Sequence, residues 1–133
     1  MIAGVADTHA ALWFLFGDLR LSTTAKDFFD KAAAARHKIV LSPISLAEVV
    51  YLAEKNRLPA RAFDDLRTAL SNPNHILEEI AITVEVVAAM RRVPRESVPD
   101  MPDRIVAATA LFLNVPLVTR DGRIRASNVQ TVW

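Results

Sequence analysis

The chain has no cysteine among its 133 residues and only 3 glycines. Without thiols it can form neither a disulfide framework nor a thiolate metal site, which excludes zinc fingers and makes a reducing, cytoplasmic setting the expected one. It has no glycine-rich phosphate-binding loop and no Ser/His/Asp set with a nucleophile elbow. Any bound metal must therefore be held through oxygen or imidazole nitrogen.

Strong net charge and long apolar runs are also missing. A formal net charge of +1 argues against coating nucleic acid by bulk electrostatics, although local basic patches remain compatible with it. The longest uncharged stretch, 105–119, is shorter than the ~18 residues of a membrane span, and the first residues lack the basic region of a signal peptide. We expect no membrane association. The 52% of hydrophobic residues suffices for the core of one domain over 1–133.

Short apolar runs alternate along the chain with segments of helical periodicity. The apolar runs predict strands, and the periodic segments predict helices with boundaries uncertain by ~2 to 4 residues. Helices between consecutive strands favour a mostly parallel five-stranded sheet that is covered on both faces, an α/β fold. The expected strands are 2–6, 38–42, 76–82, 116–119 and 129–133, and the expected helices are 8–16, 22–36, 45–56, 60–70, 83–92 and 103–114.

Four carboxylates stand where a strand should end or where a helix at that same edge should begin: Asp7, Glu48, Asp103 and Asp121. Ligands of open parallel sheets bind outside the carboxyl ends of the strands. We therefore expect the four side chains to converge at this edge. Hard divalent cations prefer carboxylate oxygens, so the pattern predicts a site for Mg²⁺ or Mn²⁺.

Each acid also has a purely structural interpretation. Asp7 could cap the first helix, Ser45 and Glu48 spell a capping box, and Asp121 with Gly122 is an ordinary turn dipeptide. Two carboxylates ~4 Å apart repel by about 4 kcal/mol at an effective dielectric near 20, which a nearby cation would offset. Four unrelated caps have no reason to share one edge, so we favour the common site.

Hydroxyl and guanidinium groups flank the acids. The hydroxyls could orient an acid or a metal-bound water, or simply cap the backbone. The arginines could steady a polyanionic substrate, although most arginines lie on solvated surface. The candidate positioning residues are Thr8, Ser45, Arg104, Thr119, Arg120 and Arg123.

Histidines and large apolar residues are weaker candidates. His9 lies two positions after Asp7 and is expected to face away from the site. His37 and His75 are expected at the opposite edge of the sheet. Trp13 and Tyr51 are more typical of core residues than of ligand contacts.

Four ordered motifs complete the pattern: Asp-Thr-His-Ala-Ala-Leu-Trp at 7–13, Ser-Pro-Ile-Ser-Leu-Ala-Glu-Val at 42–49, Asp-Arg-Ile-Val-Ala-Ala-Thr-Ala at 103–110, and Val-Thr-Arg-Asp at 118–121. In this order and spacing they resemble the PIN domain, and specifically the VapC toxins of bacterial type II toxin-antitoxin systems. The resemblance implies a three-layer α/β/α fold, Mg²⁺- or Mn²⁺-dependent cleavage of RNA, inhibition by a cognate VapB antitoxin, and the homodimer common among relatives.

By the same resemblance, Asp7, Glu48 and Asp103 are the central acids, Asp121 is the fourth, and Asp100 is a candidate supporting metal ligand. One departure concerns the loop shape, because the Pro-Asp-Met-Pro run at 99–102 replaces the more usual His-x-Asp-Pro-Ala run. The implied mechanism is in-line attack of a metal-activated water on an RNA phosphodiester.

Two other function classes remain open on the residues alone. A receiver-like phosphoacceptor domain also gathers acids at the carboxyl edge of its sheet, but no lysine follows a late strand here, where such a domain needs one. A catalytically silent module that only binds a partner is the other. Incubation with metal and RNA separates the nuclease from both.

Overall fold

A single five-stranded sheet, with strand order β3-β2-β1-β4-β5, organises the computed structural model, which describes residues 1–133. All neighbouring strands pair in parallel, which confirms the predicted α/β fold. All carboxyl ends therefore lie at one edge. The strands are β1 (Ile2–Ala6), β2 (Lys38–Leu41), β3 (Leu77–Glu79), β4 (Leu117–Val118) and β5 (Thr131–Val132).

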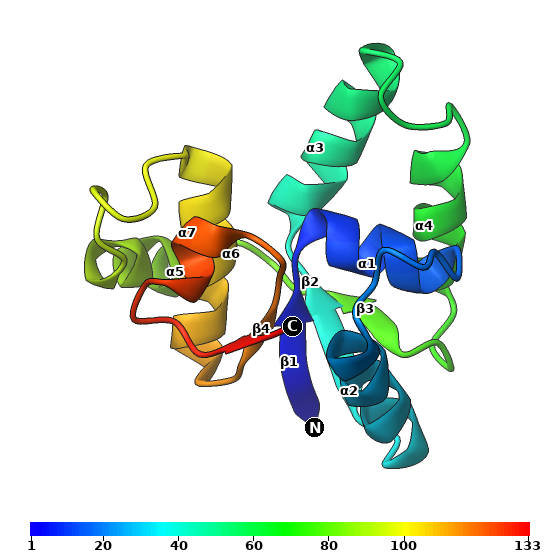
Figure 1. Cartoon of the computed structure of the whole chain (residues 1–133), viewed down its shortest axis with the longest axis horizontal. Helices are drawn as coiled ribbons and strands as arrows, with labels where there is room; N and C mark the ends of the chain where they lie inside the picture. The colour runs from blue at the N-terminus through cyan, green and yellow to red at the C-terminus, as the bar shows by residue number, and fades with distance from the viewer.

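Helices cover both faces of the sheet and give the predicted three layers (Figure 1). None of them is long and apolar enough to cross a bilayer. A short 3₁₀ turn follows α5 at Met90–Arg92. The helices are α1 (Thr8–Leu15), α2 (Thr23–Ala34), α3 (Pro43–Glu54), α4 (Ala62–Ser71), α5 (Val84–Ala89), α6 (Met101–Leu113) and α7 (Gly122–Arg125).

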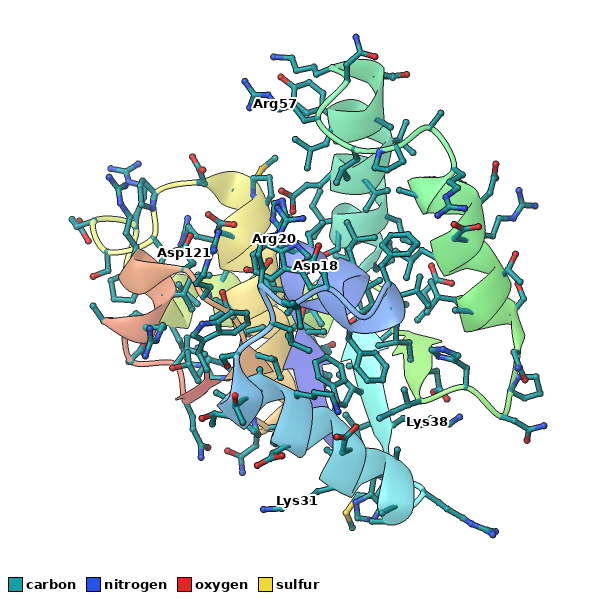
Figure 2. The ribbon with its side chains drawn as sticks, turned by 45° about the vertical axis from the view of Figure 1, so that its right-hand side comes forward. Asp18, Arg20, Lys31, Lys38, Arg57 and Asp121 are labelled. Carbon is teal, nitrogen blue, oxygen red and sulfur yellow. The ribbon has the colours of Figure 1, made fainter.

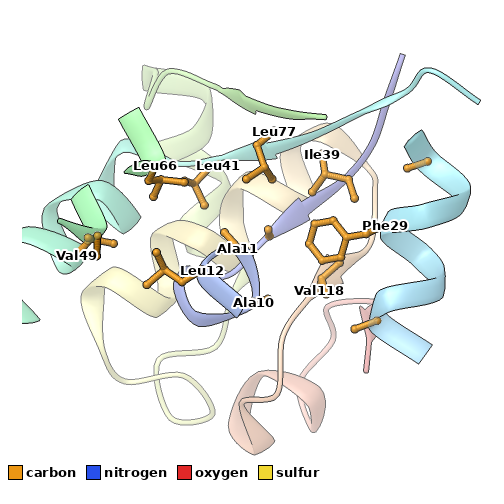
Figure 3. Close-up of a cluster of buried hydrophobic side chains, with 14 residues drawn as sticks. Ala10, Ala11, Leu12, Phe29, Ile39, Leu41, Val49, Leu66, Leu77 and Val118 are labelled. Carbon is orange, nitrogen blue, oxygen red and sulfur yellow. The ribbon is translucent and has the colours of Figure 1, made fainter. Parts of the chain in front are cut away.

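Alternate residues of the strands pack into two separate hydrophobic cores, because successive side chains of a strand point to opposite faces of the sheet. In β2, Ile39 and Leu41 face a cluster with α1, α2, α3 and α4, which Figure 3 shows around Phe29. Val40, between them, faces the second cluster, formed with α5, α6 and α7. The apolar strand centres that the sequence displays are thus explained by burial on both sides.

The central strand β1 leads directly into the candidate site. Its Gly4 allows close packing, because an added Cβ would lie 2.9 Å from the Phe28 ring and 3.0 Å from the Pro116 carbonyl oxygen. The ladder continues past the strand end, where the Asp7 N–H donates to the Val118 carbonyl at 3.0 Å. Asp7 is therefore fixed by the sheet itself.

Three local details differ from the sequence analysis. Helix α3 begins at Pro43 and is capped by Ser42, whose side chain accepts from the Ile44 N–H, so the capping box of Ser45 and Glu48, the structural alternative for Glu48, does not form. Proline suits the first helical position because its missing N–H would have no partner there. Helix α6 begins at Met101, two residues before the predicted start, and the short helix α7 was not predicted.

Candidate active site

A pocket of about 290 Å³ opens at the carboxyl edge of the sheet and contains all five acids that the sequence singles out. They come from the end of β1, from α3, from the start of α6 and from the loop after β4. The lining residues are Asp7, Thr8, His9, Ala10, Trp13, Glu48, Asp100, Asp103, Arg120 and Asp121.

Asp7 is held on both carboxylate oxygens. Its Oδ1 accepts from the Thr8 N–H at 2.7 Å, which caps α1, and its Oδ2 accepts from the buried Thr119 hydroxyl at 2.7 Å. The Thr119 oxygen also accepts from the Asp121 N–H at 3.0 Å. Thr119 therefore couples the acid after β1 to the loop after β4, as a positioning hydroxyl would.

Asp121 caps a helix as well as lining the pocket. Its Oδ1 accepts from the N–H groups of Arg123 at 2.8 Å and Ile124 at 3.1 Å and so caps α7. Asp121 therefore caps the turn of α7 and also lines the pocket. Figure 2 shows Asp121 beside this helix.

Glu48 is oriented from across the pocket by Thr8, whose hydroxyl donates to Oε1 at 2.9 Å. Burial raises the pKa of Glu48, and repulsion from Asp7 and Asp100 adds to this, while the Thr8 hydrogen bond opposes it. The two hydroxyls at positions 8 and 119 thus each fix one central acid.

Asp103 has the most perturbed carboxyl group of the site. Burial, followed by repulsion from the other four acids, raises its pKa to about 7. No partner in the chain donates a hydrogen bond to offset this cost. Carboxyls with strongly raised pKa values in a pocket are typical of functional sites.

The donor set fits a hard divalent cation, because the crowded groups are carboxylates whose repulsion a cation would relieve. No three acidic or histidine side chains are placed as a ready metal-binding group as the side chains stand. Mg²⁺ in proteins usually binds one or two carboxylates and several waters, so a cation would need only part of this acidic set. Asp7, Glu48, Asp103 and Asp121 could hold the ion, with Asp100 at the rim.

Of the six predicted positioning residues, Thr8 and Arg120 line the pocket, whereas Ser45, Arg104, Thr119 and Arg123 do not. The buried Ser45 hydroxyl has no hydrogen-bond partner and does not line the cavity. Arg123 is exposed on α7 and serves Asp121 only through its main-chain N–H.

Arg104 has a different role from the predicted one. Its Nη2 donates to the carbonyl oxygens of Met90 at 2.7 Å and Val93 at 3.1 Å. The guanidinium therefore points from α6 toward the 3₁₀ turn after α5 and ties that segment to the helix. The sequence could not show this, because the two carbonyls carry no residue-type signal.

We expect Arg104→Ala to lower the free energy of unfolding by about 2 kcal/mol, because hydrogen bonds from a charged donor contribute more than neutral ones. Urea unfolding followed by circular dichroism measures this. The exposed neighbour Arg92→Ala is the control and should change stability by less than about 0.5 kcal/mol. Equal stability of the two variants would remove the structural role from Arg104.

The prediction for His9 was also wrong, since His9 and Trp13 both line the pocket. They are one turn apart on α1, whose start forms the pocket wall, so they share a face. Trp13 is buried, as expected of a core residue. The sequence signal that could have placed them there is their spacing of four residues, one helical turn, directly after Asp7.

A larger hollow of about 690 Å³ lies at the opposite edge of the sheet, where His37 and His75 were expected. There the Lys38 ammonium donates to the carbonyls of Pro73 and His75. No carboxylate lines this hollow, so the chemistry predicted for the acids belongs to the smaller pocket.

Comparison with known proteins identifies the family and the fold of this chain. The PIN domain family matches residues 5–128. Ribonuclease VapC22 of Mycobacterium tuberculosis is 29% identical over 136 residues, spanning 100% of both chains. The fold is similar to that of VapBC2 from Rickettsia felis bound to a promoter DNA fragment (TM-score 0.70, 19% identity, 98% and 97% of the two chains).

The fold is also similar to that of a toxin-antitoxin complex from Klebsiella pneumoniae (TM-score 0.65, 23% identity, 98% and 97% of the two chains). DNA-bound VapBC from Salmonella typhimurium is a third similar structure (TM-score 0.71, 17% identity, 98% and 97%). Because the family match extends over nearly its whole length, the chain belongs to the PIN domain family.

Proposed function

We propose that this chain is a metal-dependent ribonuclease toxin of the VapC type. The observation that carries the proposal is the convergence of five carboxylates on one pocket, with the pKa of Asp103 raised to about 7. The full-length similarity to a protein named as a ribonuclease VapC supports the same activity. The catalytic acids in this proposal are Asp7, Glu48, Asp103 and Asp121, and the cofactor is Mg²⁺ or Mn²⁺.

The chain's own residues would prepare the pocket for hydrolysis of an RNA phosphodiester by water. Thr119 and Thr8 hold Asp7 and Glu48 in fixed orientations, and a cation in the pocket would favour the ionised form of Asp103, whose pKa burial and the neighbouring acids raise to about 7. A bound divalent cation would polarise the phosphate and lower the pKa of the attacking water. The reaction needs no covalent enzyme intermediate, because water attacks phosphorus in line with the leaving oxygen.

The test is incubation of the purified chain with end-labelled mixed-sequence RNA in Mg²⁺, in Mn²⁺ and in EDTA. We expect cleavage only with metal, and products without 2′,3′-cyclic phosphate, because water rather than the ribose 2′-hydroxyl attacks. Cyclic phosphate ends would contradict the hydrolytic mechanism. Failure to cleave any RNA with either metal would leave a silent binding module as the better description.

Partners of the proposed toxin follow from its relatives. The similar solved structures include VapBC assemblies and a toxin-antitoxin complex, so we propose that a cognate VapB-type antitoxin binds and inhibits this chain in the cytoplasm. Exposed Phe16, Val50 and Tyr51 on α3 and at the end of α1 offer apolar surface for such a partner. We also propose a homodimer, which analytical ultracentrifugation of the isolated chain would show.

The structure provides no support for the alternative of a receiver-like phosphoacceptor domain. Arg120 is the one arginine among the residues that line the pocket, and the lysine that such a domain needs is not among them. Acetyl phosphate labelling of Asp7 would be required to revive this alternative.

A further inference from the structure

Two arginines flank the same buried indole at the wall of the acidic pocket. Trp13 is 5% exposed, and its ring lies 4.6 Å from the Arg120 Cζ and 5.1 Å from the Arg20 Cζ. The His9 ring, at 5.5 Å, and the Trp133 ring, at 5.9 Å, contact it as well. The indole is thus enclosed, and no nucleic-acid base can stack on it.

The two arginines differ in what their N–H groups do. Arg20 donates from Nε at 3.1 Å and from Nη2 at 2.7 Å to the Asp18 carboxylate, beside which Figure 2 shows it, and it does not line the pocket. Arg120 does line the pocket but forms no ion pair with any of the five acids there. Its guanidinium donors make no side-chain hydrogen bond in the chain.

This arrangement is unexpected for a cation beside five carboxylates, and the indole supplies the reason. A cation–π contact attracts the guanidinium through its charge and occupies none of its five N–H donors. Trp13 therefore holds the charge of Arg120 at the pocket wall while leaving the donors free. A planar guanidinium with free donors is suited to bidentate binding of a phosphate.

We propose that Arg120, held by Trp13, is a phosphate-binding subsite that receives the backbone of the RNA substrate next to the acidic pocket. The inference rests on the proposed ribonuclease function and assigns Arg120 to the substrate and Trp13 to the positioning of Arg120. The five carboxylates of the pocket would repel an approaching polyanion unless a fixed positive charge offsets their negative charge. The guanidinium of Arg120 supplies such a charge. Arg120 is the arginine of the pocket lining.

Binding of RNA to a non-cleaving background tests the subsite. The background is Asp7→Asn in Mg²⁺, and the probe is a fluorescein-labelled mixed-sequence single-stranded RNA of twenty nucleotides, titrated by anisotropy at several salt concentrations. Adding Arg120→Ala should weaken binding about 10-fold and reduce the salt slope by about 0.7, the value for one lost phosphate contact with a single strand. Arg20→Ala, which removes a cation from the same indole, is the matched control and should change neither quantity.

Different failures have different meanings. An Arg120→Ala variant with unchanged affinity and salt slope, while the wild-type chain still cleaves RNA, would overturn the subsite alone. Equal losses from Arg120→Ala and Arg20→Ala would also overturn it, because the effect would then be a general one of charge. A chain that neither binds nor cleaves the RNA pool would overturn the proposed function and the subsite together.

The role of Trp13 has its own readout. Trp13→Phe keeps a buried ring but weakens the cation–π contact, so RNA binding should fall several-fold in the same background. The Trp13→Phe and Arg120→Ala double variant should bind no more weakly than Arg120→Ala alone, because both remove one interaction. Additive losses would show that Trp13 acts only through the fold, and thermal melting of each variant confirms that the compared chains are folded.

Discussion

Asp103→Asn is expected to slow RNA cleavage by at least about 100-fold at saturating Mg²⁺ while leaving the chain folded. The amide is a weaker ligand for a hard cation than the carboxylate and removes one charge from the pocket. The fold should tolerate the change because no hydrogen bond of the chain depends on the Asp103 carboxylate. Single-turnover cleavage of end-labelled RNA, with melting of the same preparation, measures both effects.

Asp7→Asn should also abolish cleavage, but at a cost in stability that Asp103→Asn does not have. The Asp7 carboxylate accepts from both the Thr8 N–H and the Thr119 hydroxyl, whereas an asparagine side chain has one acceptor oxygen. We expect a loss of about 1 kcal/mol from the broken contact, partly offset by relief of repulsion. The sequence alone gives no sign of this cost, because it does not reveal the Thr119 contact.

Asp27→Asn is a suitable control for both variants, since it removes an exposed acid from α2, far from the pocket lining. It should leave cleavage unchanged. Normal cleavage by Asp103→Asn would remove that residue from the site, and normal cleavage by both pocket variants would refute the nuclease mechanism.

Much of the fold could be predicted because the central strands β1, β2 and β4 have consecutive buried residues and so are buried on both faces. Val40 packs on one core while Ile39 and Leu41 pack on the other, so the strand reads as a continuous apolar run bounded by polar residues. Parallel strands then place their carboxyl ends together, which is sufficient to bring Asp7 and Asp121 to one edge. The site acids followed from topology and needed no knowledge of side-chain contacts.

Local pairings were harder to predict because several residues could satisfy the same demand. Ser42 and Ser45 both offer a hydroxyl near the start of α3, and the proline at position 43 decides in favour of Ser42. Glu48 is then available to accept from Thr8, 40 positions away in the chain. Arg104 likewise binds main-chain carbonyls, whose positions depend on the packed fold rather than on residue type.

The stability of the chelated chain should fall as pH rises from about 4 to about 7. The pKa of Asp103 is raised from 3.8 to about 7, so between these values the folded chain keeps a proton that the unfolded chain has lost. Stability decreases with pH wherever the folded state binds more protons. The raised pKa of Glu48 acts in the same direction. Allowing for solvent screening of partly exposed Asp103, we expect its contribution to be about 2 kcal/mol.

Urea unfolding in EDTA between pH 4.5 and pH 8, on the wild-type chain and on Asp103→Asn, isolates this contribution. The asparagine cannot titrate, so the variant should be the more stable chain at pH 8 and the advantage should vanish near pH 4.5. The lowered pKa of His75 makes the stability of both chains rise with pH and therefore cancels in their difference. Saturating Mg²⁺ should stabilise the wild-type chain more at pH 8 than at pH 5, because ionised carboxylates bind the cation and the folded chain presents them together. A difference between the two chains that does not change with pH would show that Asp103 is not a titrating member of the acidic pocket.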